Sequence, residues 1–338
     1  METLTGALGR LPRLRLGCYP TPLHRLGGLE TALNYRGIYI KRDDLSGLGP
    51  GGSKLRSLEY LLGEALDGGK KQVIVSGPGQ SNLCTLTAAA SAKVSLPCLL
   101  IHNCAEPGRR TGNLLLNYIM GAESIFLGDI SARERRAFEE KLAADLEEKG
   151  GKPFVIRNGG TTGTGAMGYA EIAAEIRRQC GEQGFDIGTV FVPGGNGGVA
   201  AGFIYGNAVM GRPFRVCVIS VEDSREELAG HIRGVIAEAE RLAGIPFPGD
   251  IEDGCDIEDA YRGEGWGINT AESEEAVRDF PRTEGIFIEH VYTAKVIAGM
   301  EDCIRRGKTK GGLCYLHTGG FGSLFSQFES VSGVTGPL

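Results

Sequence analysis

The sequence lacks the features that mark several classes of protein. No apolar run approaches the roughly 20 residues of a membrane-spanning helix, and the N-terminal stretch METLTGALGRLPRLRLG has neither a long apolar segment nor a small-residue cleavage site. The nine cysteines are an odd number and include no C-x-x-C pair. We therefore expect no membrane contact, no secretory signal and a reducing, cytoplasmic location. The five histidines are scattered, so we expect no metal site.

A surplus of positive charge is also missing. The chain has 36 Lys and Arg against 42 Asp and Glu, a formal net charge of −6. Nucleic-acid binding needs a basic surface, so we expect no such partner. Glycine is in excess, with 54 of 338 residues, about twice the usual share. Because the glycines follow no Gly-x-y period, we expect them in turns, close packing and ligand-binding loops.

Strand-like and helix-like segments alternate along most of the chain. Residues 53–69 repeat apolar side chains at helical spacing, and the apolar run 71–77 follows as a strand. This alternation predicts an α/β fold with a parallel sheet covered by helices. Residues 224–285 are more charged and are expected to be less regular. Further strands are predicted within 37–44, 96–103, 123–128, 152–160, 189–195, 214–223 and 312–317, further helices within 81–95, 110–122, 131–150, 166–184 and 198–211, and a strand end followed by a helix within 286–307.

The length allows about two domains of roughly 150 residues each. We expect residues 1–49 and 159–338 to form a large domain, with residues 50–158 inserted as a small domain. Strands from both ends of the sequence would then meet in one sheet.

A glycine-rich turn delivers Lys54 to the start of a helix in DDLSGLGPGGSKLRSLEY. A lysine fixed in this way can form an imine with a carbonyl cofactor, because the turn holds the amine and a domain interface can exclude water from it. The same residues also fit an ordinary surface lysine at a helix start. A phosphate-binding P-loop is excluded, since it needs glycine directly before the lysine and Ser53 stands there.

Ser81 and Asn82 follow the turn Gly77-Pro78-Gly79-Gln80 and open the next helix. The exposed N–H groups of a helix N-terminus bind a carboxylate or a phosphate. Ser and Asn are also good N-caps, so a purely structural role is equally consistent with these residues.

The segment TVFVPGGNGGVAAG leaves two ligands open. Its glycines, between a buried strand and a helix, make a nest of N–H donors for a phosphate. Gly195, Gly197 and Ala200 also fit a loose G-x-G-x-x-A pattern, with Glu222 after the next strand as the ribose ligand of a nicotinamide cofactor. The position in mid-chain, and Gly198 directly after Gly197, favour the compact phosphate site.

Five motifs together resemble one family. They are KRDDLSGLGPGGSKLRSLEY, QSN, GGNGGVAAG, the Tyr-Thr-x-Lys of VYTAK, and HTGG, in order between about residues 15 and 328. The chain resembles the pyridoxal-phosphate enzymes of the tryptophan-synthase-β fold (fold type II), above all the D-cysteine desulfhydrase and 1-aminocyclopropane-1-carboxylate (ACC) deaminase group. The resemblance implies a two-lobed, three-layer parallel-sheet fold, pyridoxal 5′-phosphate bound by the large domain, a small amino-acid substrate and a homodimer.

The resemblance also implies roles for individual residues. Lys54 would be the Schiff-base lysine, and freed on substrate binding it would carry protons. The implied catalytic residues are Lys54, Ser81 and Tyr292; the cofactor-binding residues are Lys54, Asn82, Gly195, Asn196, Gly197, Gly198, Val199 and Thr318; the substrate-binding residues are Ser81, Asn82, Leu83, Trp266 and Tyr292.

The chain departs from the family pattern at four positions. ACC deaminases carry Glu directly after the tyrosine of Tyr-x-x-Lys, where this chain has Thr293. A neutral hydroxyl such as that of Thr318, retained as in desulfhydrase-like members, would be a weaker partner for the pyridine nitrogen than a carboxylate. Ser53 replaces an Asn, Leu83 replaces the His after QSN, and Trp266 replaces a second active-site tyrosine. Because the indole N–H only donates, Trp266 cannot act as an acid or base.

The resemblance therefore implies a lyase that performs β-elimination on a small amino acid, giving a 2-oxo acid and ammonia as in D-cysteine desulfhydrase. A weak electron sink suits loss of an activated β-substituent better than opening of an unactivated ring. Alternatives of the same class are β-replacement and ring-opening deamination. Alternatives of another class are a catalytically inactive pyridoxal-phosphate-binding protein and an NAD-binding protein.

Overall fold

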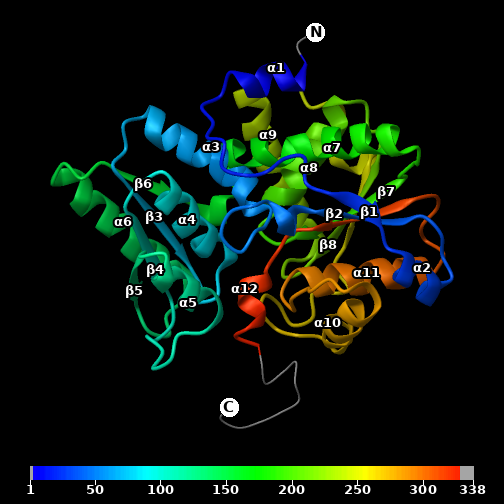
Figure 1. Ribbon diagram of the computed structural model, residues 1–338. Coiled ribbons are helices and arrows are strands. Elements are labelled where there is room, and N and C mark those ends of the chain that lie inside the picture. Colours follow the sequence, from blue (N-terminus) through cyan, green and yellow to red (C-terminus); the bar gives the residue numbers. More distant parts are fainter. Residues whose placement is uncertain (1–2, 328–338) are drawn as a thin grey trace.

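The computed structural model describes residues 3–327, which form two separate sheets (Figure 1). The predicted α/β fold with parallel sheets is confirmed, with one antiparallel pair at the edge of the larger sheet. The larger sheet contains, in spatial order, β1 (Leu23–Arg25), β2 (Ile38–Arg42), β10 (Leu313–His317), β7 (Thr189–Gly194), β8 (Arg215–Ser220) and β9 (Cys255–Glu258). The smaller sheet contains β5 (Glu123–Phe126), β4 (Cys98–His102), β3 (Gln72–Gly77) and β6 (Pro153–Ile156).

Twelve α-helices connect and cover the strands of the described chain. None of them is both long and apolar enough to cross a membrane. They are α1 (Leu4–Gly9), α2 (Gly27–Leu33), α3 (Lys54–Asp67), α4 (Asn82–Lys93), α5 (Gly112–Ile119), α6 (Ala132–Glu148), α7 (Gly163–Gln183), α8 (Gly198–Val209), α9 (Arg225–Ala243), α10 (Ala271–Glu284), α11 (Thr293–Arg305) and α12 (Phe321–Leu324).

The larger sheet joins the two ends of the sequence and lies between two helical layers. Strand β10 pairs in parallel with β2 on one side, with Tyr315 opposite Ile40, and with β7 on the other. Every residue of β10 is buried, as expected for a central strand covered on both faces. Helices α7, α8 and α9 pack on one face, while α2, α10 and α11 pack on the other (Figure 1).

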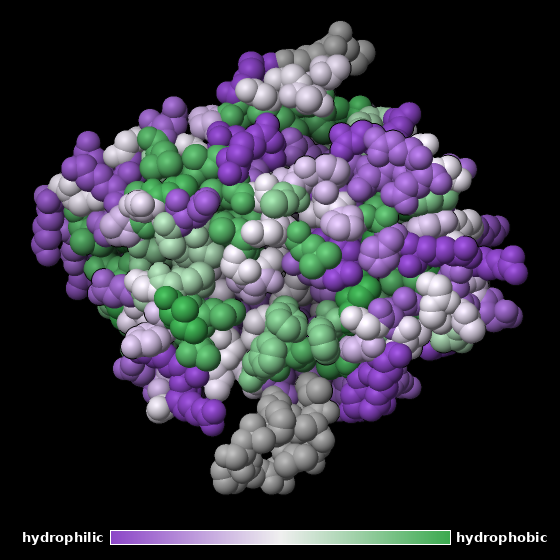
Figure 2. Space-filling model, viewed as in Figure 1, coloured by the Kyte–Doolittle hydropathy of each residue, from purple (hydrophilic) through white to green (hydrophobic). Residues whose placement is uncertain are grey.

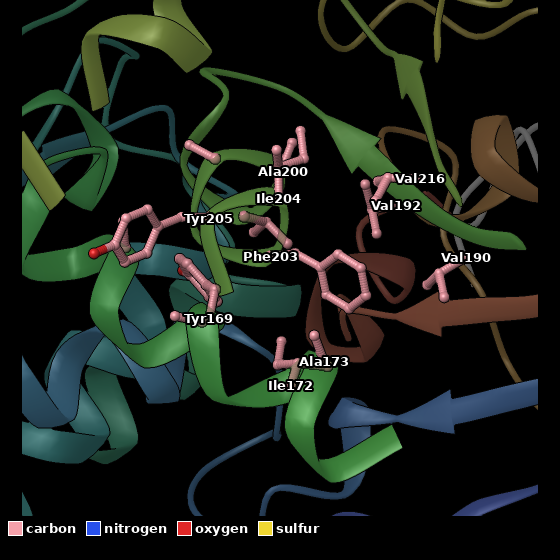
Figure 3. Packing of buried hydrophobic residues seen from close by; sticks show 14 of the residues in the cluster. Tyr169, Ile172, Ala173, Val190, Val192, Ala200, Phe203, Ile204, Tyr205 and Val216 are labelled. Atoms are coloured by element: carbon pink, nitrogen blue, oxygen red, sulfur yellow. The ribbon is translucent and has the colours of Figure 1, made fainter. Parts of the chain in front are cut away.

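Helices α7 and α8 pack closely because α8 has glycines on its contact face. A Cβ at Gly202 would overlap the Ala166 carbonyl oxygen, and one at Gly206 would overlap that of Ala170. Only glycine permits this close approach of α8 to α7. Figure 3 shows the apolar cluster between these helices and the strands, including Tyr169, Ile172, Ala173, Val190, Val192, Ala200, Phe203, Ile204, Tyr205 and Val216.

The smaller sheet has the same layered construction. Helices α3 and α4 pack together and share a core with β3, while α6 packs on β3, β4 and β6. Helix α3 also packs on α7, which covers one face of the larger sheet. It therefore links the two sheets, and the position of its first residue depends on both.

A fully buried ion network fastens α3 to the larger sheet. The Arg56 guanidinium donates to both carboxylate oxygens of Asp43 at 2.7 and 2.9 Å and to both oxygens of Glu175 at 2.8 and 2.9 Å. The Lys41 ammonium lies 2.8 Å from Glu175 Oε2. The two positive and two negative charges balance, and planar bidentate pairing gives the guanidinium a defined orientation.

Two expectations about local structure were wrong. Residues 224–285 are more regular than expected, because they contain α9, β9 and α10, although residues 259–269 between β9 and α10 form neither a helix nor a strand. The segment Ile286–Ile288 alternates buried and exposed side chains as a strand does, yet it does not pair with either sheet in the described chain. Ile286 and Ile288 instead pack in the core with α10 and α11, whereas Phe287 is exposed, so period-two burial arose without a strand.

Candidate active site

A cavity of about 750 Å³ is lined by residues that follow strands of both sheets. Asn103 follows β4, Gly195 follows β7 and Thr318 follows β10, so the cavity lies at the carboxyl ends of the parallel strands, where α/β proteins bind ligands. The structure brings together every residue that the sequence analysis assigned to the site: Lys54, Ser81, Asn82, Leu83, Gly195, Asn196, Gly197, Gly198, Val199, Trp266, Tyr292 and Thr318.

Lys54 is the first residue of α3, as its sequence context predicted. The preceding turn needs glycine, because Gly51 and Gly52 have φ of +75° and +140°. The turn is tied to the C-terminal HTGG segment, since the Ser53 N–H donates to the Thr318 carbonyl oxygen at 3.0 Å. Residues from the two ends of the chain thus hold Lys54 in place.

The Lys54 ammonium group faces the cavity and donates to the Gly159 carbonyl oxygen at 3.3 Å. Burial lowers the pKa of Lys54 to about 8, against the opposing charge of Glu222. Part of the population is therefore neutral near physiological pH. A neutral amine can attack a carbonyl, so the alternative of an ordinary surface lysine does not hold.

The glycine loop after β7 forms the N-terminal end of α8. Gly197 is the N-cap residue at φ +84°, and having no side chain it leaves the first N–H groups of the helix to a ligand. A Cβ at Gly198 would lie 2.9 Å from Thr161 Oγ1, so the loop is pressed against its neighbour. Such a helix terminus suits a compact dianion such as a phosphate monoester.

Ser81, the N-cap residue of α4, and Asn82, its first residue, also line the cavity. Ser81 Oγ accepts the Cys84 N–H at 3.3 Å, so Ser81 acts as the N-cap. Asn82 Oδ1 accepts from Asn113 Nδ2 at 2.8 Å, which fixes its amide. Leu83 lines the cavity and also packs in the core of the smaller sheet. Capping and lining of the cavity therefore coexist at this helix end.

Tyr292 and Trp266 meet beside the glycine loop. The Trp266 indole N–H donates to the Tyr292 hydroxyl at 2.7 Å. A Cβ at Gly195 would lie 3.1 Å from Tyr292 Cε1, so the phenol ring covers that glycine. Burial raises the pKa of Tyr292, and the hydrogen bond from Trp266 only partly opposes this, so the phenol stays protonated.

Sequence reasoning did not assign Glu289, whose buried carboxylate lines the cavity. Its oxygens accept the N–H groups of Val291, Tyr292 and Thr293 at 2.8–2.9 Å, which caps α11. Burial raises the pKa of Glu289 in spite of these hydrogen bonds. The Thr293 hydroxyl donates to the Glu289 carbonyl oxygen at 3.0 Å, so this side chain is engaged by the helix cap.

Two further charged groups lie on the cavity wall: Glu222, which the sequence analysis considered only as the ribose ligand of a nicotinamide cofactor, and Arg135, which it did not assign. Burial and the neighbouring Asp223 raise the pKa of Glu222 to about 6. Arg135, in the first turn of α6, donates to Ser76 Oγ at 3.3 Å and to Asn103 Oδ1. The sequence analysis predicted a helix within 131–150 and gave it no functional role, and only the fold shows that its first turn reaches the cavity.

The cavity fits pyridoxal phosphate in three respects. Lys54 supplies a buried amine of lowered pKa, the glycine loop supplies backbone donors for a phosphate, and the Tyr292 ring and Thr318 supply a wall of mixed polarity. All of these features line one cavity.

Comparisons with known proteins agree with this fit. The family model "Pyridoxal-phosphate dependent enzyme" matches residues 14–319. The chain is 34% identical over 324 residues to a putative ACC deaminase of Pyrococcus horikoshii, covering 96% of both chains. It is 35% identical over 334 residues to a D-cysteine desulfhydrase of Salmonella newport, covering 96% of this chain and 98% of the relative.

Solved structures show the same architecture. The crystal structure of an ACC deaminase homologue superposes with a TM-score of 0.89 at 32% identity, covering 98% of this chain and 99% of that one. Threonine deaminase isoform 2 of Solanum lycopersicum shares the fold, with a TM-score of 0.69 at 18% identity. The predicted fold type II architecture and cofactor are confirmed, and the nicotinamide alternative is set aside. The chain belongs to the pyridoxal-phosphate-dependent enzymes and is a lyase of the group that includes ACC deaminases and D-cysteine desulfhydrases.

Proposed function

We propose that this enzyme eliminates the β-substituent X of a small amino acid. In the net reaction the Cα–H, Cβ–X and Cα–N bonds break, a proton returns to Cβ, water supplies the ketone oxygen at Cα, and ammonia and HX leave. The observation that carries the proposal is the neutral Thr318 at the cavity wall, together with Thr293 where ACC deaminases carry a glutamate. A hydroxyl partner supports loss of an activated β-substituent better than opening of an unactivated ring.

Lys54 is proposed to hold the cofactor and to move the substrate proton. Bound pyridoxal phosphate withdraws electron density from the substrate Cα. The pKa of Lys54, lowered by burial to about 8, lets the neutral amine accept the Cα proton and the ammonium form return a proton to Cβ. Both protonation states are populated near neutral pH, which is the condition for efficient general acid–base catalysis.

The other wall residues are proposed to bind and orient. The N-terminus of α4 at Ser81 and Asn82 would receive the substrate carboxylate, and residues 195–199 at the N-terminus of α8 would receive the cofactor phosphate. Leu83, Trp266 and Tyr292 would bound the substrate side chain. Two different helix termini would thus bind the two anions.

The decisive variant is Lys54→Ala, compared with Lys71→Ala at an exposed lysine. We expect Lys54→Ala to lose both the absorbance band of attached cofactor and turnover, while Lys71→Ala keeps both. The substrate is sought with a panel of D- and L-amino acids bearing different β-substituents. Spectral shift of the cofactor and release of 2-oxo acid are measured in parallel. A retained band in Lys54→Ala would contradict the assignment.

Leu83 and Trp266 favour a second candidate within the same class, since both differ from the residues usual in desulfhydrase-like members. β-Replacement would yield a new amino acid when a nucleophile is present, and ring opening would release 2-oxobutyrate from ACC. An inactive cofactor-binding protein would give no α-proton exchange in deuterated water with any amino acid of the panel.

We also propose a homodimer. Phe287, Phe321 and Phe325 form an exposed aromatic cluster. The ring centroids of Phe287 and Phe321 lie 5.6 Å apart, and those of Phe321 and Phe325 lie 5.1 Å apart. Helix α12 packs on α5, which exposes Tyr118 and Ile119, and Figure 2 shows apolar surface in this part of the molecule. Apolar patches of this kind mark interfaces. Sedimentation equilibrium of the holoenzyme should give twice the chain mass, and a monomer at all concentrations would contradict the proposal.

Residues 50–158 are proposed as the small domain, since β3–β6 and α4–α6 all lie within this range. Residues 1–49 and 159–338 would then form the large domain, which supplies the glycine loop. A cytoplasmic location is proposed from the nine cysteines, all of which are free thiols in the structure.

A further inference from the structure

Lys295, the lysine of the Tyr-Thr-x-Lys motif, is fully buried in α11 and uses all three of its N–H donors on main-chain carbonyls. Its Nζ lies 3.2 Å from the Val221 oxygen, 2.7 Å from the Arg262 oxygen and 3.0 Å from the Gly265 oxygen. Val221 directly follows β8, whereas Arg262 and Gly265 belong to the segment 259–269 between β9 and α10. One ammonium group therefore fastens an irregular segment to the sheet and to α11.

The fastened segment carries Trp266 to the cavity. Gly265 and Gly267 flank it at φ +139° and +75°, conformations that favour glycine, so the backbone turns sharply on both sides of the indole. The indole N–H then reaches the Tyr292 hydroxyl at 2.7 Å. Tyr292 is the N-cap residue of α11, and Lys295 follows three positions later in its first turn. The same helix end therefore contacts both the main chain of the segment and the Trp266 side chain.

Other contacts hold the rest of the segment. The Arg262 guanidinium donates to the Glu222 carbonyl oxygen at 3.4 Å, and the Tyr261 hydroxyl donates to Asp302. Neither contact lies next to Trp266. Burial lowers the pKa of Lys295, whereas the charges of Glu289 and Glu222 act in the opposite direction. A charged donor to three carbonyls makes hydrogen bonds stronger than neutral ones, so its loss should free the segment rather than shift it slightly.

We propose that Lys295 is a positioning residue that holds the segment 259–269 so that Trp266 closes the cavity against Tyr292 and limits the size of the substrate side chain. Trp266 acts here as a wall, because its N–H is committed to Tyr292 and the ring has no acid or base function. Only the predicted effect of Lys295 on substrate size rests on the proposed function. The placement of Trp266 itself is independent of the reaction.

The single tryptophan of the chain makes this placement measurable without turnover. In cofactor-free protein, all tryptophan fluorescence comes from Trp266. We expect Lys295→Met to shift the emission to longer wavelength and to raise the acrylamide quenching constant about twofold, as Trp266, which is 36% exposed in the parent, becomes more exposed. Lys295→Arg, which keeps a charged multiple donor but is bulkier, should recover more of the parent signal than Lys295→Met does. The control is Lys308→Met, at an exposed lysine beyond α11 paired with Glu258 on the surface.

Kinetics provide the second readout, with the amino acid that the substrate panel identifies. If Lys295 acts through Trp266, Lys295→Met should raise KM by about tenfold, a change equivalent to about 1.4 kcal/mol, with a smaller change in kcat. The kcat/KM for larger amino acids should rise relative to that for the best small amino acid. In a Trp266→Phe background the same lysine substitution should change KM by less than about twofold, because the two effects are then not additive.

Three results would overturn the inference: parent-like emission and quenching in a folded Lys295→Met, equal KM effects in both backgrounds, or loss of kcat alone. If Lys295→Met does not fold, Lys295→Gln, which keeps two donors without the charge, takes its place in both assays. An enzyme inactive on every substrate would contradict the proposed function, while the fluorescence of the cofactor-free protein would still decide the role of Lys295.

Discussion

Replacing Arg56 with methionine should cost the protein much of its stability. Arg56 lies two residues after Lys54 and is 0% exposed, and it pairs bidentately with Asp43 and with Glu175. Methionine fills similar space but leaves two buried carboxylates facing a single cation, Lys41. Removing one partner from a buried ion network leaves uncompensated charge, which costs about 3–5 kcal/mol.

The protonation of Glu175 gives a second measure of the same effect. Burial alone would raise the pKa of Glu175, but hydrogen bonds and charge from Arg56, and then Lys41, lower it from 4.5 to about 2. A shift of this size corresponds to about 3 kcal/mol at neutral pH, in line with the estimate above. Because the folded-state pKa is lowered, this stability is present above pH 4.5 and is lost as the pH falls toward 2.

Urea denaturation at neutral pH and under acid conditions would measure both effects. The matched control is Arg233→Met, since Arg233 also pairs with two carboxylates, Asp250 and Glu252, but is 46% exposed. Exposed pairs contribute about 0–1 kcal/mol, so the control should unfold nearly as the parent does. Arg56→Met should also lose less stability than the parent between neutral pH and acid. Equal midpoints for the two variants would refute the reasoning.

Two further predictions concern the α8 packing and the amine of Lys54. In thermal unfolding, Gly206→Ala should destabilise the fold by about 1–3 kcal/mol, because its Cβ would overlap the Ala170 carbonyl oxygen. The control Gly230→Ala, on α9, should stabilise the fold by about 0.5–1 kcal/mol, because its Cβ meets nothing within 4 Å. Stability changes of the same sign for both variants would contradict this explanation of the packing. Burial lowers the pKa of Lys54 to about 8. The rate at which pyridoxal phosphate attaches to cofactor-free enzyme, followed by absorbance, should therefore increase as the pH rises through about 8 and then level off. A rate that still rises near the ordinary lysine pKa of 10.5 would contradict this prediction.

Local sequence was sufficient to predict those site residues that lie in one short segment containing a turn and a helix start. Lys54, Ser81 and the glycine loop 195–198 are each read from consecutive residues, and the structure places them at helix N-termini around one cavity. The parallel sheets likewise follow from the alternation of apolar strands and amphipathic helices.

The missed features depend on contacts that sequence spacing does not encode. The acceptors of Lys295 are main-chain carbonyls 30 to 74 residues away, and a carbonyl carries no side-chain signature. Glu289 was missed because its role depends on the backbone path before α11. Helix α9 did have a local signal, a capping box formed by Ser224 and Glu227 and buried apolar residues at helical spacing, but its charged face obscured that period.

The most direct test of the central claim is to locate the cofactor on the chain. Borohydride reduction of the holoenzyme, followed by proteolysis and mass spectrometry, would fix the cofactor covalently to the lysine that carries it. We expect the modification on Lys54 alone. Modification of Lys295 or of any other lysine, or none in protein that holds pyridoxal phosphate, would contradict it.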